Sequence, residues 1–276
     1  MNLSLKKSDF IIREKEFHEY FYKDKEHSRI VDPYVLFESI SAFENKFIVN
    51  FFGDLEGKVI ADIGAGTGES SIYFALKGAK VIWIDIAEAA YEKAKYLAKK
   101  FNVEENIHFL VGDIIEIFKD YHSLKIDYIY GNGVLHHIDY EKLPESMYNV
   151  LSDGGKFAFI EPLKYNPLIN IYRMLADKIR TFDERPLGLG VSKRFGKYFY
   201  ANHREFWLFS LAVFLKFYLI DRVRPNDEPY WKKIFYDLDG CKSILLFTEH
   251  LDKILTKITP LNFLCWNTVI YGSKSF

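Results

Sequence analysis

Cysteine is scarce in this chain, which has two in 276 residues, Cys241 and Cys265. They are far apart and form no C-x-x-C pair, so a disulfide framework and a zinc ribbon are excluded; we expect both thiols to be buried and inert. Long apolar runs are also missing. The longest covers residues 206–215, ends at Lys216 and is too short to cross a bilayer. The N-terminal segment lacks the apolar stretch of a signal peptide, which predicts a cytoplasmic protein.

An excess of charge of one sign is absent as well. The chain has 37 basic and 38 acidic residues and a formal net charge of −1. Without a basic stripe we expect no nucleic-acid partner. What is abundant is hydrophobic side chain, at 49% of residues, with 17% aromatic. This content predicts a substantial core, with aromatic clusters at residues 195–200 and 206–218.

The most informative segment is Val59–Ser71, an apolar run that breaks into three alternate glycines before a predicted helix. Gly64, Gly66 and Gly68 can adopt positive φ and let the main chain approach a ligand closely. The spacing is G-x-G-x-G, not the G-x-G-x-x-G of a pyrophosphate loop. Asp62 stands two residues before the first glycine, where a carboxylate repels pyrophosphate but can meet a ligand ammonium.

The segment Asp62–Gly68 resembles motif I of the class I S-adenosylmethionine-dependent methyltransferases, and further blocks follow in that family's order up to residue 161. The resemblance implies an α/β fold: a doubly wound, seven-stranded Rossmann-like sheet of order 3-2-1-4-5-7-6 with its last strand antiparallel. It also implies an enzyme that uses S-adenosylmethionine and releases S-adenosylhomocysteine. The cofactor-binding residues it implies are Asp62, Gly64, Ala65, Gly66, Gly68, Asp85, Ile86, Asp113, Ile114 and Asn132.

Two of these acids stand at the ends of predicted strands. Asp85 ends the second predicted strand, where it is placed to accept the ribose hydroxyl protons. Asp113 ends the third, and the resemblance places it near the adenine amino group. Each acid alone is equally typical of an ordinary strand-end turn. A dehydrogenase stays the alternative interpretation of the glycine loop.

The candidate catalytic residues are His136, His137 and Glu161, which follow the fourth and fifth predicted strands. A general base is needed only if the acceptor is protonated at neutral pH, and each histidine is about as often a structural group. After Asn132 the sequence lacks the two prolines and the aromatic residue that are typical of enzymes that methylate adenine amino or glutamine amide nitrogens. This weakens the case for a nucleobase or glutamine target. We expect the acceptor to be a small organic molecule that is methylated on oxygen, sulfur or nitrogen, and the aromatic content of the expected cap favours an apolar or aromatic one.

No metal is expected. Adjacent His136 and His137 cannot easily share one ion, and no H-x-x-x-H spacing accompanies them, His203 or His250. An acidic pair, Asp183 and Glu184, is a candidate for binding a charged substrate group, although such pairs are more often solvated turns.

The chain is expected to begin with a helical lid at residues 1–57, in which His18, Tyr20 and Tyr22 are candidate lid residues. The methyltransferase domain follows at 58–276. Strands six and seven are predicted at 205–211 and 263–271. Residues 212–261 between them predict a helical insertion that caps the substrate or forms a homodimer surface.

Two other functions stay open at this point. One is a lipid or quinone methyltransferase that docks on a membrane through residues 206–218. The other is a non-catalytic module that binds the cofactor and uses the insertion to contact a partner.

Overall fold

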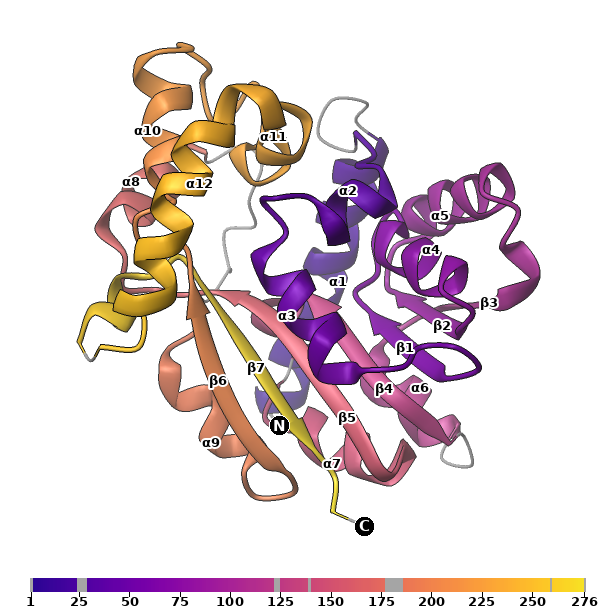
Figure 1. The fold of residues 1–276 in the computed structure, drawn as a ribbon. Helices are drawn as coiled ribbons and strands as arrows, with labels where there is room; N and C mark the ends of the chain where they lie inside the picture. The colour runs from indigo at the N-terminus through magenta and orange to yellow at the C-terminus, as the bar shows by residue number, and fades with distance from the viewer. Residues whose placement is uncertain are drawn as a thin grey trace.

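A computed structural model of the chain describes residues 2–23, 29–121, 125–138, 140–176, 186–258 and 260–275, with side chains from Ile11 onward. Its centre is a seven-stranded sheet of order β3-β2-β1-β4-β5-β7-β6, which confirms the predicted topology (Figure 1). The strands are β1 Val59–Ile63, β2 Lys80–Asp85, β3 Ile107–Val111, β4 Ile126–Asn132, β5 Leu151–Pro162, β6 Tyr200–Phe206 and β7 Asn267–Ser273. Strands β1 to β5 pair in parallel, and β7 runs antiparallel to both β5 and β6.

The predicted bounds of the last two strands were shifted. Strand β6 ends at Phe206, because Trp207 adopts a positive φ of 65° and turns the chain out of the sheet. The Asp252 carboxylate then accepts hydrogen bonds from the backbone N–H groups of residues 208–210, at 2.7 to 3.2 Å. Before β7, residues 261–264 form a 3₁₀ turn instead of the start of the strand.

Helices cover both faces of the sheet. They are α1 Asn2–Lys23, α2 Pro33–Glu38, α3 Phe43–Phe52, α4 Glu69–Leu76, α5 Glu88–Lys100, α6 Ile114–Asp120, α7 Leu143–Val150, α8 Pro167–Leu175, α9 Ser192–Phe195, α10 Ala212–Leu219, α11 Tyr230–Tyr236 and α12 Leu238–Leu255. Short 3₁₀ turns are η1 Glu104–Asn106, η2 Leu135–His137, η4 Leu189–Val191 and η5 Leu261–Leu264. Helices α2 to α5 pack on one face, and α6, α7 and α9 on the other.

Alternation along the strands sorts the core into these two layers. In β2, Val81 and Trp83 join the cluster beneath α4 and α5, whereas Ile82 and Ile84 join the cluster beneath α6 and α7. Successive side chains of a strand point to opposite faces, so a strand covered on both sides must be apolar throughout. The sheet is therefore the middle layer of an α/β/α sandwich.

The N-terminal segment folds into helices as expected. The Asp32 carboxylate accepts hydrogen bonds from the backbone N–H groups of Tyr34 and Val35, and Pro33 occupies the first turn of α2. Aspartate at the cap and proline in the first turn are the residues that a helix start favours. The division of the chain into a lid and a domain at residue 57 stays a prediction.

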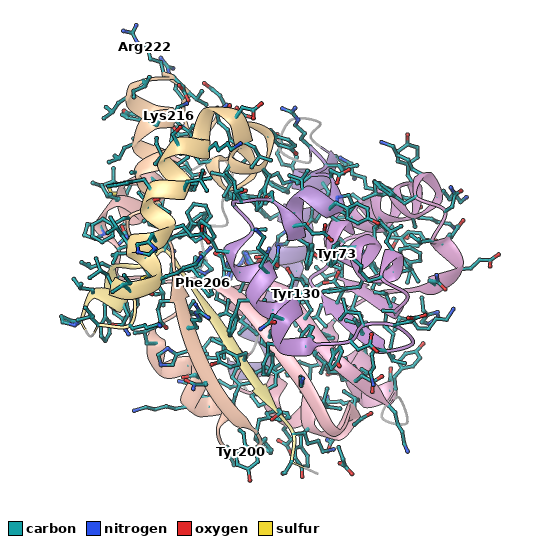
Figure 2. The ribbon with its side chains drawn as sticks, in the orientation of Figure 1. Tyr73, Tyr130, Tyr200, Phe206, Lys216 and Arg222 are labelled. Carbon is teal, nitrogen blue, oxygen red and sulfur yellow. The ribbon has the colours of Figure 1, made fainter. Side chains whose placement is uncertain are left out.

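Most of the aromatic load is core. Figure 2 shows Tyr73 and Tyr130 inside the molecule, and both are almost fully buried, whereas Tyr200 is 76% exposed at the edge of the sheet. The segment 206–218 is largely buried too, since Phe206, Trp207, Phe214 and Phe217 belong to the core. Across the described helices, none combines the length and the apolar character needed to span a bilayer.

Helices α10, α11 and α12 form the expected insertion and gather with α8 at one end of the sheet (Figure 1). Cys241 and Cys265 are buried and unpaired, as expected. Burial raises the pKa of the Cys241 thiol to about 11 and raises the pKa of Cys265 further. Both thiols are therefore protonated at neutral pH, which makes them poor nucleophiles.

Candidate active site

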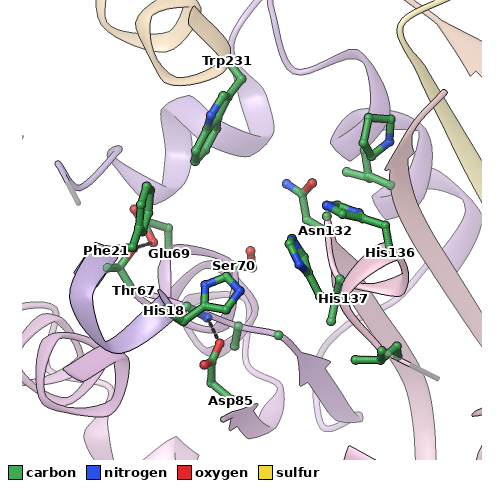
Figure 3. Close-up of a pocket in the computed structure, with 18 of the residues that line it drawn as sticks. His18, Phe21, Thr67, Glu69, Ser70, Asp85, Asn132, His136, His137 and Trp231 are labelled. Carbon is green, nitrogen blue, oxygen red and sulfur yellow. Dashed lines mark hydrogen bonds between the residues drawn. The ribbon is translucent and has the colours of Figure 1, made fainter. Parts of the chain in front are cut away.

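A cavity of about 1020 Å³ lies at the carboxyl ends of the parallel strands. In open α/β sheets this edge is where ligands bind. Figure 3 shows its lining, with Asp85 on one side and Trp231 across from it. We call the part around Gly64, Gly66, Asp85 and Asp113 the glycine-loop end. The part lined by Glu44, Tyr172, Trp207, Trp266 and Asn267 is the aromatic end.

The glycine loop has no room for side chains. Gly64 and Gly66 have φ angles of 62° and 51°, which L side chains rarely adopt. A Cβ atom at Gly64 would lie 2.4 Å from Val134 Cγ2, and one at Gly66 would lie 2.7 Å from the Tyr22 hydroxyl oxygen. Backbone groups of residues 64–67 therefore form the cavity wall directly, so a ligand can approach the main chain.

Two acids at neighbouring strand ends complete this end of the cavity. Asp85 is buried and accepts hydrogen bonds from the backbone N–H groups of Gly66, at 2.8 Å, and Ala87, at 3.0 Å. Burial raises its pKa, which the hydrogen bonds partly oppose. Asp113 caps α6 by accepting from the Ile115 N–H. Both line the cavity, followed by Ile86 and Ile114.

These residues fit an adenosine group. The crowded glycine turn leaves backbone exposed to the cavity, and the two carboxylates supply acceptors for hydroxyl and amino protons. The side chains of Ile86 and Ile114 offer apolar contacts beside them. S-Adenosylmethionine would therefore be held at the glycine-loop end.

Two residues expected near the cofactor do not line the cavity. The Asp62 carboxylate is buried and accepts a hydrogen bond of 2.6 Å from the Ser71 hydroxyl, which joins β1 to α4. Burial raises its pKa to about 7. Gly68 starts α4 in a left-handed conformation, where a Cβ would lie 2.9 Å from the Ala94 Cβ. Both support the loop from behind.

Glu161 holds the loop that follows β4. Its Oε1 accepts from the backbone N–H groups of Val134, at 2.8 Å, and Leu135, at 2.6 Å, and its Oε2 lies 2.6 Å from His136 Nδ1. Burial raises the pKa of Glu161 to about 7. The side chain is fully buried and does not line the cavity, so its contacts hold the loop in place. The sequence made Glu161 only a candidate general base, and a catalytic role for it stays a prediction.

The two adjacent histidines have separate carboxylate partners. His136 and His137 both line the cavity beside Asn132 (Figure 3). His137 Nδ1 lies 2.8 Å from Glu14 Oε2, on α1. Burial lowers the pKa of His137 to about 4, so its imidazole is neutral at pH 7.

Helix α1 covers the cavity with one of its faces. Glu14, His18 and Tyr22 line it, at helical spacing, whereas Tyr20 is 73% exposed on the opposite side. Of the candidate lid residues, His18 and Tyr22 are therefore in place and Tyr20 is not. Glu14 was missed by sequence reasoning, although the i, i+4 spacing of Glu14 and His18 is a usable signal.

The aromatic end was also missed. Glu44 is buried and lines the cavity, and its Oε1 accepts a hydrogen bond of 2.7 Å from Asn267 Nδ2. Burial raises its pKa, against the effect of that hydrogen bond. The rings of Trp207 and Trp266 lie beside it in the lining, with centroids 5.8 Å apart. No local motif marks these residues, because they come from α3, the end of β6 and the start of β7. The predicted acidic pair Asp183 and Glu184 lies outside the described residues.

Comparisons with known proteins agree with this geometry. Residues 54–187 match the family model of a methyltransferase domain. A sterol 24-C-methyltransferase of Saccharomyces cerevisiae is 28% identical over 186 residues, which cover 65% of this chain and 46% of the relative. A phosphoethanolamine N-methyltransferase of Arabidopsis thaliana is 24% identical and covers 56% of this chain and 34% of its own. The chain thus spans about half the length of these relatives or less.

Solved structures are similar in fold. A phosphoethanolamine N-methyltransferase of Haemonchus contortus, in complex with phosphomonomethylethanolamine and S-adenosylhomocysteine, superposes with a TM-score of 0.54. The superposition covers 85% of this chain and 52% of that one, at 15% identity. The fold around the cavity is therefore one that binds this cofactor product in another protein.

Proposed function

Since the chain belongs to the class I S-adenosylmethionine-dependent methyltransferases, we propose that it methylates a small organic acceptor, and that the acceptor atom is an amine nitrogen. The main observation in favour of an amine is that Glu44 is buried and lines the cavity. A carboxylate that is buried among aromatic rings, yet faces a cavity, is suited to an ammonium group. Tryptophan faces add cation–π attraction for the same charge.

The arrangement of the sheet supports a division of the cavity between two ligands. The glycine-loop end lies at β1, β2 and β3, and would hold the cofactor through Asp85 and Asp113. The aromatic end lies at β5 and β7, where Asn267 begins β7. When bound, the cofactor supplies an electrophilic methyl carbon on a sulfonium.

The chain's own residues then have three tasks. The aromatic side chains exclude water and hold the acceptor in place, and positioning of this kind contributes up to about 7–11 kcal/mol to a transfer reaction. An ammonium must lose a proton before its lone pair can react. His136 is the proposed proton acceptor, because Glu161 holds its Nδ1 and orients Nε2 as the basic nitrogen.

The names of the relatives support two acceptor classes. The phosphoethanolamine enzymes are named for an amine substrate, and the sterol enzyme for a carbon acceptor. A sterol at the aromatic end would leave the charge of the Glu44 carboxylate beside apolar surface, with the Asn267 amide but no cation to pair with it, which costs free energy. The buried carboxylate therefore favours the amine.

The test is a transfer assay with methyl-labelled S-adenosylmethionine. The acceptors are a panel of primary, secondary and tertiary amines, including phosphoethanolamine and sarcosine, a sterol in detergent micelles, and a cell extract. We expect label in an amine. Label found only in sterol, lipid or protein would reject the amine proposal. Binding of S-adenosylhomocysteine without any transfer would favour the non-catalytic module instead.

Membrane docking is tested separately, by flotation with liposomes. Because most of segment 206–218 is buried, we expect the protein to stay at the bottom of the gradient. Flotation together with labelled lipid would support the lipid methyltransferase.

A further inference from the structure

Three side chains with metal-binding chemistry meet where α1 crosses the loop after β4. Glu14 and His18 are one helical turn apart on α1, and His137 is the last residue of η2. Glu14 Oε2 lies 2.8 Å from His137 Nδ1 and 3.5 Å from His18 Nε2. One candidate ligand atom from each residue lies within 4.8 Å of the others.

We propose that Glu14, His18 and His137 form a binding site for one divalent transition-metal ion such as Zn²⁺. The ion would join α1 to the loop after β4 and so fix the helix over the cavity. This inference does not depend on which acceptor is methylated.

The donor set suits the ion. Two imidazole nitrogens and one carboxylate oxygen are a ligand set that proteins use for zinc and for other first-row metals. With metal–ligand bonds of about 2.0–2.1 Å, the ligand atoms of a tetrahedral site lie about 3.4 Å apart. The separations at Glu14 Oε2 fall on either side of that value, at 2.8 and 3.5 Å, so small side-chain rotations would be enough.

The surroundings suit it too. Glu14 is 4% exposed. The side chains of His18 and His137 are 20% and 17% exposed, and all three residues line the cavity. Because all three residues line the cavity, a ligand from the cavity would be able to complete the coordination of the ion, as in metal sites with three protein ligands.

Other histidine–carboxylate pairs lack the third ligand. His136 with Glu161, and His203 with Glu205, each bring one imidazole to one carboxylate. Among the residues that the structure describes, Glu14, His18 and His137 are the one such group of three. The pair His203 and Glu205 is therefore a matched control for a simple hydrogen bond.

The experiment measures metal binding by the full chain. The protein is stripped with a chelator and titrated with Zn²⁺ by calorimetry in the presence of a competing chelator, and with Co²⁺ by visible absorption. We expect one ion per chain and d–d absorption bands of a low-coordinate cobalt site. Glu14→Gln and His18→Asn should each weaken Zn²⁺ binding at least 100-fold, whereas His203→Asn should leave it unchanged.

A thermal measurement guards against variants that simply lose α1. Zn²⁺ at saturation should raise the Tm of the unmodified chain and of His203→Asn, because an ion that binds only the folded state stabilises it. The proposal is overturned if the unmodified chain binds neither ion with a Kd below about 0.1 mM, a limit that corresponds to weak binding. Binding that is equal in the unmodified chain and in both ligand variants overturns it as well.

Discussion

The glycine-loop end of the cavity is built from short loops at the ends of β1, β2 and β3, whereas the aromatic end is built from side chains of distant segments. Gly64, Gly66 and Asp85 lie within 22 residues of one another. Glu44 and its partner Asn267 are 223 residues apart. Local chain geometry thus fixes the first end, and tertiary packing fixes the second.

The difference separates two kinds of specificity. The proposed recognition of the cofactor uses backbone groups of one turn and carboxylates at two strand ends, all of them placed by local chain geometry. Side chains from α3 and from the ends of β6 and β7 take no part in the glycine turn, and variation at such positions lets one fold accept different substrates. Substitutions at the two ends should therefore affect different constants.

The largest effect is expected for Asp85→Ala. Hydrogen bonds to a charged group contribute about 1.5–3 kcal/mol each, so losing two ribose contacts should weaken S-adenosylhomocysteine binding about 100-fold or more. Isothermal calorimetry measures the Kd, with Asp120→Ala at the exposed end of α6 as the control. Unchanged binding by Asp85→Ala would remove the ribose role of this residue.

Next in size is the loss of the proton acceptor. His136→Asn should lower kcat with an amine about 100-fold, which is the lower range for general-base catalysis, and leave cofactor binding unchanged. Glu161→Gln should lower kcat less than His136→Asn does, because the Glu161 carboxylate orients the imidazole without touching the acceptor. It should also shift the pH–rate profile. Calorimetry and thermal unfolding control for folding. If both variants keep full kcat, proton transfer must use another group.

A smaller effect is expected for Glu44→Gln, which tests the aromatic end of the cavity. Losing the charge should raise KM for the amine about tenfold, since an exchange of this kind costs about 1.4 kcal/mol. The Kd of S-adenosylhomocysteine should stay constant. Steady-state kinetics and calorimetry on one preparation measure both, with Glu56→Gln as an exposed control. A variant that loses cofactor affinity with unchanged KM would reverse the assignment of the two ends.

The last prediction concerns stability instead of binding or catalysis. Asp62 has a folded-state pKa of about 7, raised by burial above an ordinary value of 3.8. The folded state therefore keeps a proton that the unfolded state loses, and Asp62 lowers the free energy of unfolding as pH rises from about 4 to 7. Between pH 5 and pH 7.5 the free energy of unfolding, measured with urea, should fall more for the unmodified chain than for Asp62→Asn. Equal slopes would show that Asp62 is ionised in the folded protein.

The same contrast explains how far sequence reasoning reached. Strand β2 ends at Asp85 as predicted, and the strand order was correct, because glycine turns and apolar runs are local signals. Strand β6 was displaced by five residues, since the apolar run after it looks like a strand. The backbone N–H groups of this apolar run, at residues 208–210, instead donate hydrogen bonds to the Asp252 carboxylate on α12, more than 40 residues away in the sequence.

The predicted site residues also fall into two groups, those that line the cavity and those that do not. Asp85 and Asp113 line the cavity as predicted, and their binding roles stay predictions. The family resemblance implied that Asp62 binds the cofactor, and Glu161 was a candidate general base, yet neither side chain lines the cavity. Ser71 and backbone N–H groups donate hydrogen bonds to their carboxylates instead. Which way a strand-end side chain turns depends on neighbours that the linear pattern does not reveal.

Helix α1 contacts two parts of the cavity, the glycine turn and the loop after β4. Tyr22 approaches the glycine turn at Gly66, and Glu14 holds His137 on the loop that carries the proposed proton acceptor. A cofactor at the glycine turn and an acceptor beside the loop after β4 would not bind independently if the binding of one of them shifted this helix. Thermodynamic linkage then makes the effect mutual: whatever factor the cofactor applies to the affinity for the acceptor, the acceptor applies to the affinity for the cofactor.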